Sequence, residues 1–291
     1  MTQLSKIATL QFTALQSATL LFTILFVALF ASSASAQSLR KLLENPQNVI
    51  ESKWERNEQG DTELNYYNED YCDYYLYRAN DRSYNLNSGK NTIFKIEKGS
   101  QVDNPFKSSS SYRFYRGKFP KDFQINTPYA LPVKDGEKTE WRTDPREPFK
   151  TMNFHLKEGD IVYATRSGVA CETAHSRHLL IYHPDHTFAA YLVMKDIFVK
   201  PGETITTGQP VGIAGPTGVS ITFFFLDENK FSGFDASGYP YSHFIPIFRT
   251  SEGDVKPEEK KFYQAKNDDE LMMQDMTKRE KKKYLKQKDS K

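Results

Sequence analysis

Five of the six histidines in this chain have a spacing or position that could serve metal chemistry. His175 with His178, and His183 with His186, have the H-x-x-H spacing that holds metals in some proteins. Neither pair has a set of carboxylate or cysteine partners beside it, and both lie at the ends of expected strands. Polar turn residues are therefore the simpler interpretation of both pairs. His155 is kept as a minor candidate for a metal ligand.

Three segments then set a recognisable frame: Gly159–Ala164 (GDIVYA), Val199–Gly202 (VKPG) and Gly212–Gly218 (GIAGPTG). In order and spacing they resemble the lysostaphin-type, or LytM-like, peptidoglycan metallopeptidases. The resemblance covers roughly Tyr129 to Phe248. It implies the duplicated hybrid motif fold of that family and a link to the bacterial cell wall.

The family holds one zinc ion with a histidine and an aspartate spaced H-x-x-x-D, and with the second histidine of an H-x-H strand. The first H-x-H histidine and a separate strand histidine assist catalysis. Alternate residues of a strand face the same side, so H-x-H directs both imidazoles into one groove. Three protein ligands leave a fourth position for a water that attacks a peptide carbonyl.

At all five positions this chain has a residue of another type. By spacing, the former zinc and catalytic positions are Phe149, Asn153, Val193, Phe223 and Phe225. This alignment deletes one residue after Gly218, and without the deletion the H-x-H pair falls on Phe224 and Leu226. Phenylalanine, leucine and valine cannot bind zinc or transfer protons, and asparagine is a weak neutral ligand. The resemblance therefore implies a pseudoenzyme with no catalytic residues, no metal site and no cofactor.

The strand that replaces H-x-H is apolar on both faces, because Phe223–Phe225 stand between Ile221 and Leu226. One face would line the former substrate groove together with Val193 and Phe149. We expect the aromatic side chains to fill part of this groove and to leave a shallow apolar cleft for a partner or ligand.

The first 36 residues have the pattern of an export signal. Lys6 supplies the positive charge, Thr19 to Ala31 is an almost unbroken apolar run, and Ala34–Ala36 is a small-residue cleavage site. The run is shorter than the roughly 20 residues that a transmembrane helix needs. The pattern predicts cleavage after Ala36, secretion to the periplasm or cell envelope, and no transmembrane helix in the mature chain.

The mature chain predicts an all-β protein. Residues 37–125 alternate β-rich runs with polar turns, which is typical of a small antiparallel β-sandwich. Residues 126–250 would form the LytM-like antiparallel domain, and 251–291 a charged tail. Asp268–Lys288 consists mostly of good helix formers, although a solvated tail is the default for such a composition.

Charge is concentrated at the C-terminal end. Thr277–Lys291 holds eight lysines and arginines against two acidic residues, whereas the whole chain has a formal net charge of +2. The remainder of the chain is therefore net negative, which disfavours a nucleic-acid partner. Contact of the basic tail with an anionic surface is an alternative to a freely solvated terminus.

The two cysteines, Cys72 and Cys171, leave two interpretations open. In an exported chain they permit a disulfide that would clip the N-terminal region onto the later domain. Closing a loop of that length is worth about 4–5 kcal/mol in the chain-entropy model. Alternatively, both are unpaired and Cys171 is a small buried apolar residue. The closeness of Cys171 to His175 in sequence is too little to predict a thiol nucleophile.

These observations favour an exported, catalytically inactive LytM-like pseudopeptidase that binds or organises peptidoglycan or an envelope protein through the former substrate groove. The alternative is an active zinc endopeptidase that cleaves peptidoglycan peptide cross-links with shifted ligands such as His155. A third hypothesis is a structural envelope subunit whose β-sandwich pairs with another chain.

Overall fold

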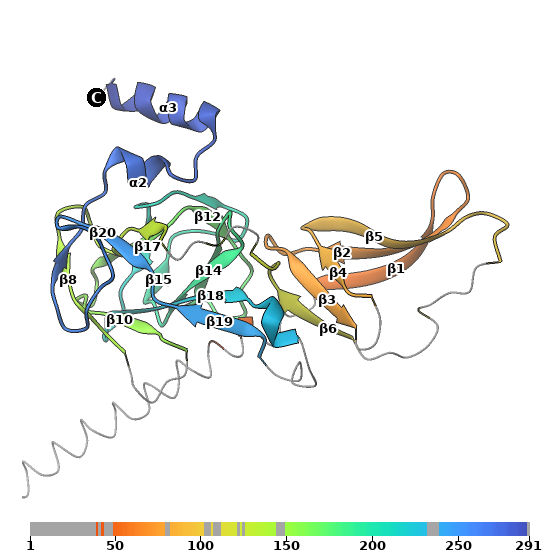
Figure 1. Cartoon of the computed structure of the whole chain (residues 1–291), viewed down its shortest axis with the longest axis horizontal. Coiled ribbons are helices and arrows are strands. Elements are labelled where there is room, and N and C mark those ends of the chain that lie inside the picture. Colours follow the sequence, from red (N-terminus) through yellow and green to blue (C-terminus); the bar gives the residue numbers. More distant parts are fainter. Residues whose placement is uncertain are drawn as a thin grey trace, which may run out of the picture.

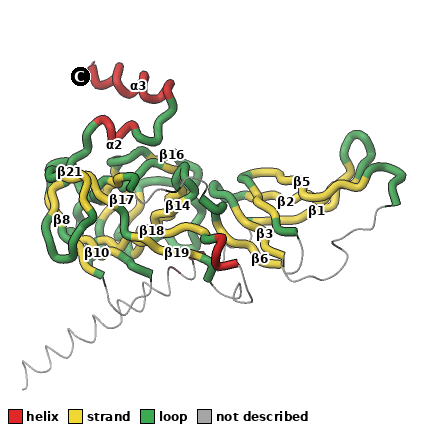
Figure 2. The backbone as a smooth tube through the Cα atoms, in the orientation of Figure 1, coloured by secondary structure: helices red, strands yellow, loops and turns green. Residues whose placement is uncertain are grey.

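The computed structural model describes Leu39, Leu42, Leu43 and residues 49–78, 82–101, 106, 112–120, 123, 126–143, 149–231 and 239–289. The expected export signal, residues 1–36, lies outside these residues. The described part is all-β as predicted, with two short α-helices near its C-terminal end (Figures 1 and 2). Leu39, Leu42 and Leu43 are helical.

Two three-stranded antiparallel sheets build the N-terminal unit, which lies at one end of the molecule's long axis (Figure 1). Their strands, in spatial order, are β1 (Ile50–Arg56), β2 (Thr62–Asn68) and β5 (Gly89–Ile96), and β4 (Tyr84–Leu86), β3 (Tyr74–Arg78) and β6 (Tyr112–Arg116). Tyrosine is frequent in these strands, as is usual for a half-buried pleated surface. Tyr66, Tyr74 and Tyr115 are buried between the sheets and the rest of the protein.

An eight-stranded sheet forms the centre of the second unit. Seven of its strands run in the order β16 (Thr204–Ile205), β12 (Gly168–Ala170), β13 (Leu179–Tyr182), β14 (Thr187–Leu192), β18 (Val219–Leu226), β10 (Met152–Phe154) and β9 (Trp141–Arg142). The eighth strand, β19 (Tyr241–Phe244), also pairs with β18. The Pro184-Asp185 turn joins β13 to β14, and the Asp185 carboxylate accepts a hydrogen bond from the Thr187 backbone N–H at 3.1 Å.

Smaller sheets cover one face of this central sheet. They are β11 (Ile161–Tyr163), β17 (Pro210–Ile213) and β15 (Asp196–Ile197); β21 (Gly253–Val255), β20 (Ile247–Thr250) and β7 (Pro128–Tyr129); and β22 (Tyr263–Gln264) with β8 (Lys138–Thr139). Only β20 and β7 pair in parallel among the described strands. Tyr129, Phe154, Phe223 and Phe248 belong to the fully or almost fully buried core on this side.

The other face of the central sheet is buried against the N-terminal unit. One continuous apolar cluster joins Leu180, Phe188 and Leu226 of the central sheet to Tyr74 and Leu76 of β3. Leu39, Leu42 and Leu43 belong to the same cluster. The central sheet is thus the middle layer of the protein, with an apolar core on each side.

A 3-10 turn, η1 (Glu228–Phe231), follows β18, and the described part of the chain ends in two helices, α2 (Asp269–Met273) and α3 (Lys278–Asp289). Asp268 caps α2 by accepting a hydrogen bond from the Leu271 N–H. The expected single helix is divided, because Thr277 and Glu280 form a capping box that starts α3 anew, with Thr277 N–H donating to Glu280 Oε2 at 2.7 Å. Among the described residues, none of the helices is both long and apolar enough to cross a lipid bilayer.

Candidate functional site

The pairing of strand β18 with its neighbours determines which of the expected site positions share a face of the sheet. Its partners are Asn153 opposite Ser220 on β10, Ala190 opposite Thr222 on β14, and His243 opposite Phe224 on β19. Side chains of directly opposed residues lie on the same face of a sheet. Ser220, Thr222, Phe224 and Leu226 therefore share one face with Asn153 and His243, and this face is turned toward the N-terminal unit.

Phe149 lies on this same face, within an aromatic cluster. Its ring centroid is 5.1 Å from that of His243 and 5.0 Å from that of Tyr239. The Phe224 ring lies 5.8 Å from His243. The position that corresponds to the first family histidine is thus occupied by a ring packed among other rings.

Phe223 and Phe225 point to the opposite face of β18. The Phe223 ring lies 5.3 Å from Tyr129, and the Phe225 ring lies 4.8 Å from Phe123. The structure does not bring these two expected site residues together with Phe149. Of the two alignments, only the gap-free one, through Phe224 and Leu226, puts the H-x-H pair on the face that holds Phe149.

Asn153 and Val193 complete the set of expected positions. Asn153 Oδ1 accepts a 2.6 Å hydrogen bond from Ser220 Oγ, and its Nδ2 donates to the Arg142 carbonyl at 3.2 Å, so both ends of the amide are engaged within the sheet. Val193 packs on the edge of the apolar cluster. Its backbone φ of +59° is left-handed, which is a strained conformation for a β-branched residue.

The N-terminal unit covers this face of the central sheet. Gly117 directly follows β6, and a Cβ added there would lie 2.8 Å from the Phe188 ring and 3.7 Å from Leu226 Cβ, so only glycine permits this close approach. The Tyr241 hydroxyl donates to the Arg116 carbonyl at 3.2 Å. Phe224 and Leu226 are 0% exposed and Phe149 is 5% exposed. At these positions the expected shallow cleft is filled.

The residues at the family's zinc positions do not fit zinc. Two phenylalanines, a leucine and a valine offer no ligand atom, and the Asn153 amide is used in the sheet. Burial, followed by the positive charges of Lys230 and Lys150, lowers the pKa of the adjacent His243 to about 3. Its Nε2 forms a 2.9 Å hydrogen bond with the Tyr239 hydroxyl. His243 carries no motif that would have marked it from the sequence, because it reaches this face only through the pairing of β19 with β18.

The other histidines do not assemble a replacement site within the described residues. His155 is exposed, and burial lowers the pKa of both His178 and His183 to about 4. The His175 and His178 rings lie 5.0 Å apart in a loop. Among the described residues, the one group of three potential metal ligands contains no histidine at all and consists of Asp70, Cys72 and Cys171.

That group is a structural anchor rather than a cation site. Its ligand atoms lie within 4.8 Å of one another, but the Arg116 guanidinium is 3.2 Å from Asp70 Oδ2 and would repel a cation. The Asp70 carboxylate accepts further hydrogen bonds from the Tyr74 hydroxyl at 2.8 Å and from the Glu172 N–H at 2.9 Å. Glu172 belongs to the second unit, so Asp70 ties the two units together.

The two cysteines are free thiols that lie beside each other in this anchor. Both are buried, with Cys72 1% and Cys171 2% exposed. Burial is the largest cause that raises the pKa of Cys72 well above its usual value, and the hydrogen bond with Cys171 adds to it. A protonated, inaccessible thiol is a poor nucleophile, which argues against thiol catalysis.

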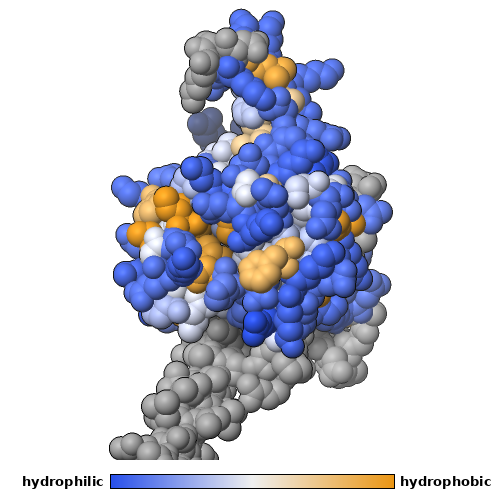
Figure 3. All heavy atoms as spheres, turned by 90° about the vertical axis from the view of Figure 1, so that its left-hand side faces the viewer, coloured by the Kyte–Doolittle hydropathy of each residue, from blue (hydrophilic) through white to orange (hydrophobic). Residues whose placement is uncertain are grey.

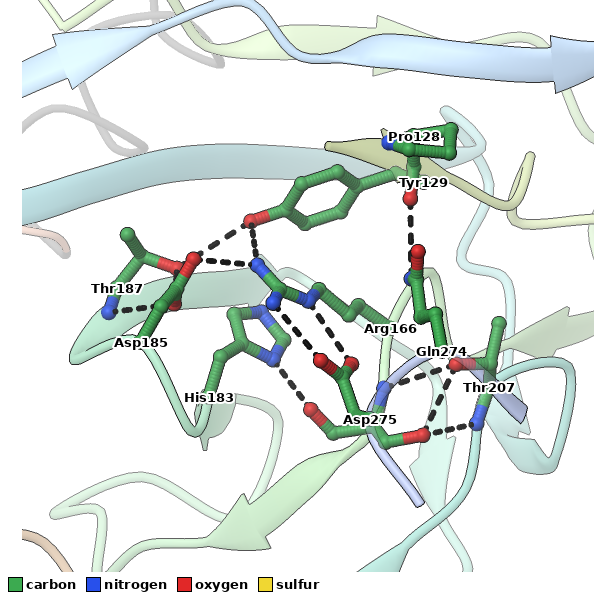
Figure 4. A network of polar contacts seen from close by, with 10 residues as sticks. Pro128, Tyr129, Arg166, His183, Asp185, Thr187, Thr207, Gln274 and Asp275 are labelled. Carbon is green, nitrogen blue, oxygen red and sulfur yellow. Dashed lines mark hydrogen bonds and ion pairs between the residues drawn. The ribbon is translucent and has the colours of Figure 1, made fainter. Parts of the chain in front are cut away.

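A second polar network holds the C-terminal helices to the central sheet (Figure 4). Arg166 Nε and Nη2 donate to the two Asp275 carboxylate oxygens, each at 2.9 Å, and Nη1 donates to Asp185 at 2.6 Å. The Tyr129 hydroxyl accepts from the same Nη1 at 3.2 Å. Gln274 Nε2 adds a 3.0 Å bond to the Pro128 carbonyl. The segment between α2 and α3 is therefore fixed on the protein body.

A cavity of about 660 Å³ lies between this segment and the edge of the central sheet. Val169, Ile205, Tyr182, Met272, Met276 and Tyr284 give it a largely apolar wall. Two of its carboxylates are already paired, Asp275 with Arg166 and Asp73 with Lys118 at 3.2 Å. It offers space but no arrangement of acid, base and nucleophile.

Comparison with known proteins shows which families and solved structures this chain resembles. No curated protein matches the sequence. Similar solved structures include the M23 metalloprotease pseudoalterin from the deep sea (17% identity, 35% of this chain and 71% of that chain, TM-score 0.30). A zinc-containing peptidase from Vibrio cholerae has 13% identity over 67% of this chain and 88% of its own, with a TM-score of 0.29. Csd3 of Helicobacter pylori has 11% identity over 84% and 79%, with a TM-score of 0.28.

The sequence pattern of peptidase family M23 matches residues 147–225, which run from just before Phe149 to Phe225 and include β10 through most of β18. The LytM-like resemblance drawn from the three sequence segments is thereby confirmed. Residues 147–225 of this chain are thus similar in sequence to peptidase family M23.

Proposed function

We propose that this protein is a catalytically inactive M23 homologue of the bacterial cell envelope that acts by binding rather than by hydrolysis. The observation that supports the proposal is the face of β18 turned toward the N-terminal unit. There Phe149 and Leu226 stand at two of the family's zinc-ligand positions and Phe224 at a catalytic position, and all three are almost completely buried. A hydrolytic site needs ligand atoms and access for both water and substrate, and these residues provide neither.

Because these positions are buried, the former groove is not available as a binding surface. Gly117 and the Arg116 carbonyl lie over Leu226 and Tyr241, where a substrate peptide would have to enter. Recognition of an envelope component through the former groove would require the N-terminal unit to separate from the central sheet. We therefore assign recognition to the exposed surfaces of the protein, and the M23 relationship makes peptidoglycan or an envelope protein the natural partner.

An active zinc peptidase with shifted ligands receives no support from the described residues. His155 is exposed and its backbone is held by Glu140 and Thr139. His243, the histidine beside Phe149, has its Nε2 bonded to Tyr239 and lies in an apolar cluster.

Metal content and wall hydrolysis test the proposal together. The full exported chain is purified without added metal, and zinc is measured by mass spectrometry before and after incubation with one equivalent of zinc. Digestion of isolated sacculi is followed beside an active zinc-dependent M23 peptidase. We expect no zinc to remain after buffer exchange and no wall peptides to be released, because apolar side chains offer no ligand atoms.

Two variants sharpen the test. His243→Ala removes the imidazole beside the former site, and His155→Ala removes the exposed candidate. Stoichiometric zinc that disappears in either variant, together with hydrolysis that disappears with it, would overturn the proposal. Binding of the intact protein to sacculi, compared with capture of envelope proteins, then separates the two partner classes.

A further inference from the structure

The C-terminal helix α3 carries an unusual concentration of positive charge. Six cations, Lys278, Arg279, Lys281, Lys282, Lys283 and Lys286, lie within nine residues of the sequence. No ion pair involves any of these six within the described part of the chain, whereas Lys288 pairs with Asp269 at 2.6 Å. Five of the six are exposed and Lys281 is half-buried. Unneutralised charge at this density repels itself unless an anionic partner balances it.

The helix is held in a fixed place, which distinguishes it from a freely solvated tail. The bonds between Arg166 and Asp275 fix the chain immediately before it, and the capping box at Thr277 and Glu280 starts it. Further along, the Tyr284 hydroxyl donates to Asp269 at 3.2 Å. Figure 1 shows α3 lying above the body of the protein, at its outer edge. The cations are therefore presented on an ordered support.

Five of the six cations of α3, all except Lys283, lie outside the lining of the cavity between this helix and the central sheet. Glu280, Lys283, Tyr284 and Gln287 line the cavity toward the central sheet. Arg279, Lys282 and Lys286 follow the three- and four-residue spacing of a neighbouring helix face. With Lys283 and Gln287 they line a shallow hollow of about 390 Å³. Figure 3 shows that the surface of this projecting part is almost entirely hydrophilic, with a small apolar spot.

Leu285 stands among these cations with 42% of its surface exposed. A soluble polyanion would need only the charges, whereas a lipid surface offers phosphates together with an apolar layer just beneath them. One leucine among six cations suits shallow contact at the headgroup level and not insertion. The whole helix is strongly polar, which also indicates electrostatic and reversible attachment.

We propose that the outer face of α3, made of Arg279, Lys282, Leu285 and Lys286, docks this protein on a membrane surface of anionic phospholipids. The proposal deepens the proposed function, because it rests on a binding role in the envelope and supplies one partner. It does not depend on the absence of hydrolysis. The zinc and sacculus assays can therefore contradict the proposed function while vesicle binding is still observed, and vesicle binding can be absent while the proposed function is supported.

Sedimentation with vesicles tests the inference. The full mature chain is mixed with vesicles of phosphatidylcholine alone, or with one quarter phosphatidylglycerol, at 50 and 500 mM NaCl. We expect binding only to the anionic vesicles and only at low salt, because exposed charges are screened over about 10 Å already at 0.1 M salt. The triple variant Arg279→Gln, Lys282→Gln, Lys286→Gln should bind on the order of 100-fold more weakly, at about fivefold for each cation removed.

The matched control changes three exposed lysines of the body, Lys157→Gln, Lys200→Gln and Lys256→Gln, which alters the net charge equally. It should bind like the unchanged protein. Leu285→Ser should weaken vesicle binding and leave binding to soluble polyphosphate unchanged.

Three results would overturn the proposal: equal losses in the two triple variants, no binding of the unchanged protein to anionic vesicles, or stronger binding to polyphosphate than to vesicles. Circular dichroism of both triple variants checks that α3 and the β-sheets remain folded. Glutamine is a good helix former, so the substitutions themselves do not disfavour the helix.

Discussion

Removing the Asp70 carboxylate should destabilise the whole protein, because it leaves a buried positive charge without its partner. The side chains of Asp70 and Arg116 are 0% and 3% exposed, and their atoms Oδ2 and Nη1 are 3.2 Å apart. Deleting one member of such a buried pair costs about 3–5 kcal/mol. The variant Asp70→Ala also leaves the Tyr74 hydroxyl and the Glu172 N–H without their acceptor.

The loss translates into a measurable change of melting temperature. For a chain of this size, 1 kcal/mol corresponds to about 2–4 °C. We therefore expect Asp70→Ala to lower the midpoint of thermal unfolding by about 6–20 °C, as measured by circular dichroism, with a matching fall in the urea midpoint. The control is Glu158→Ala, which removes the 3.0 Å ion pair with Lys195, whose side chains are about half exposed. It should cost less than about 1 kcal/mol.

A double variant separates the ion pair from the other bonds of Asp70. Asp70→Ala combined with Arg116→Met removes both charges, so its loss should be smaller than the sum of the two single losses by about 0.5–3 kcal/mol. Strictly additive losses, or an Asp70→Ala variant as stable as Glu158→Ala, would refute the argument that this pair anchors the two units.

Three further predictions concern acid stability, the cysteines and the C-terminal helices. Burial, with the charge of Arg166, lowers the pKa of His183 to about 4, whereas the unfolded value is about 6.5. The unfolded state therefore binds more protons between these values, and stability should fall as the pH drops from 6.5 to 4. Urea unfolding should show a smaller fall for His183→Gln, and an unchanged fall would contradict this. Glutathione disulfide should leave Cys72 and Cys171 unlinked in the folded protein, because both thiols are buried and the pKa of Cys72 is raised, and a link found by mass spectrometry of non-reduced peptides would disprove this. Finally, Asp275→Ala should release α3 from Arg166 and speed tryptic cleavage in the lysine-rich helix, and equal cleavage rates would show that the helix is held by other contacts.

Much of the fold follows from local sequence. The run from Ile221 to Leu226 is β-branched and aromatic, and it lies within β18 as expected. The β-branched and aliphatic residues of His178–His183 and Thr187–Met194 likewise favour the strands β13 and β14 that these segments contain, with a Pro184-Asp185 turn between them. The glycine segments identify the M23 family because each imposes a backbone constraint. A Cβ on Gly218 would lie 2.3 Å from the Phe154 carbonyl oxygen, at a φ of +87°.

The candidate site was less predictable from the sequence than the fold, because the residues that lie together depend on which face of the sheet each side chain points to. A shift of one residue exchanges the two faces of a strand, so the choice between Phe223 with Phe225 and Phe224 with Leu226 could not be made from an all-apolar run. Only the pairing of β18 with β10 and β19 resolves which face holds Phe149. This face of the central sheet is covered by Gly117 and by Leu39, Leu42 and Leu43. That coverage depends on contacts between residues distant in sequence, for which the chain carries no local signal.

The burial of Leu226 against Gly117 limits what a single substitution could achieve on this face. A histidine introduced at Leu226 would enter a dry interface, where an unpaired imidazole is costly, and it would find no second ligand at Phe149. Each single histidine substitution would therefore lower stability before any zinc affinity could compensate. Building a zinc site here would take several simultaneous substitutions and a separation of the N-terminal unit from the central sheet.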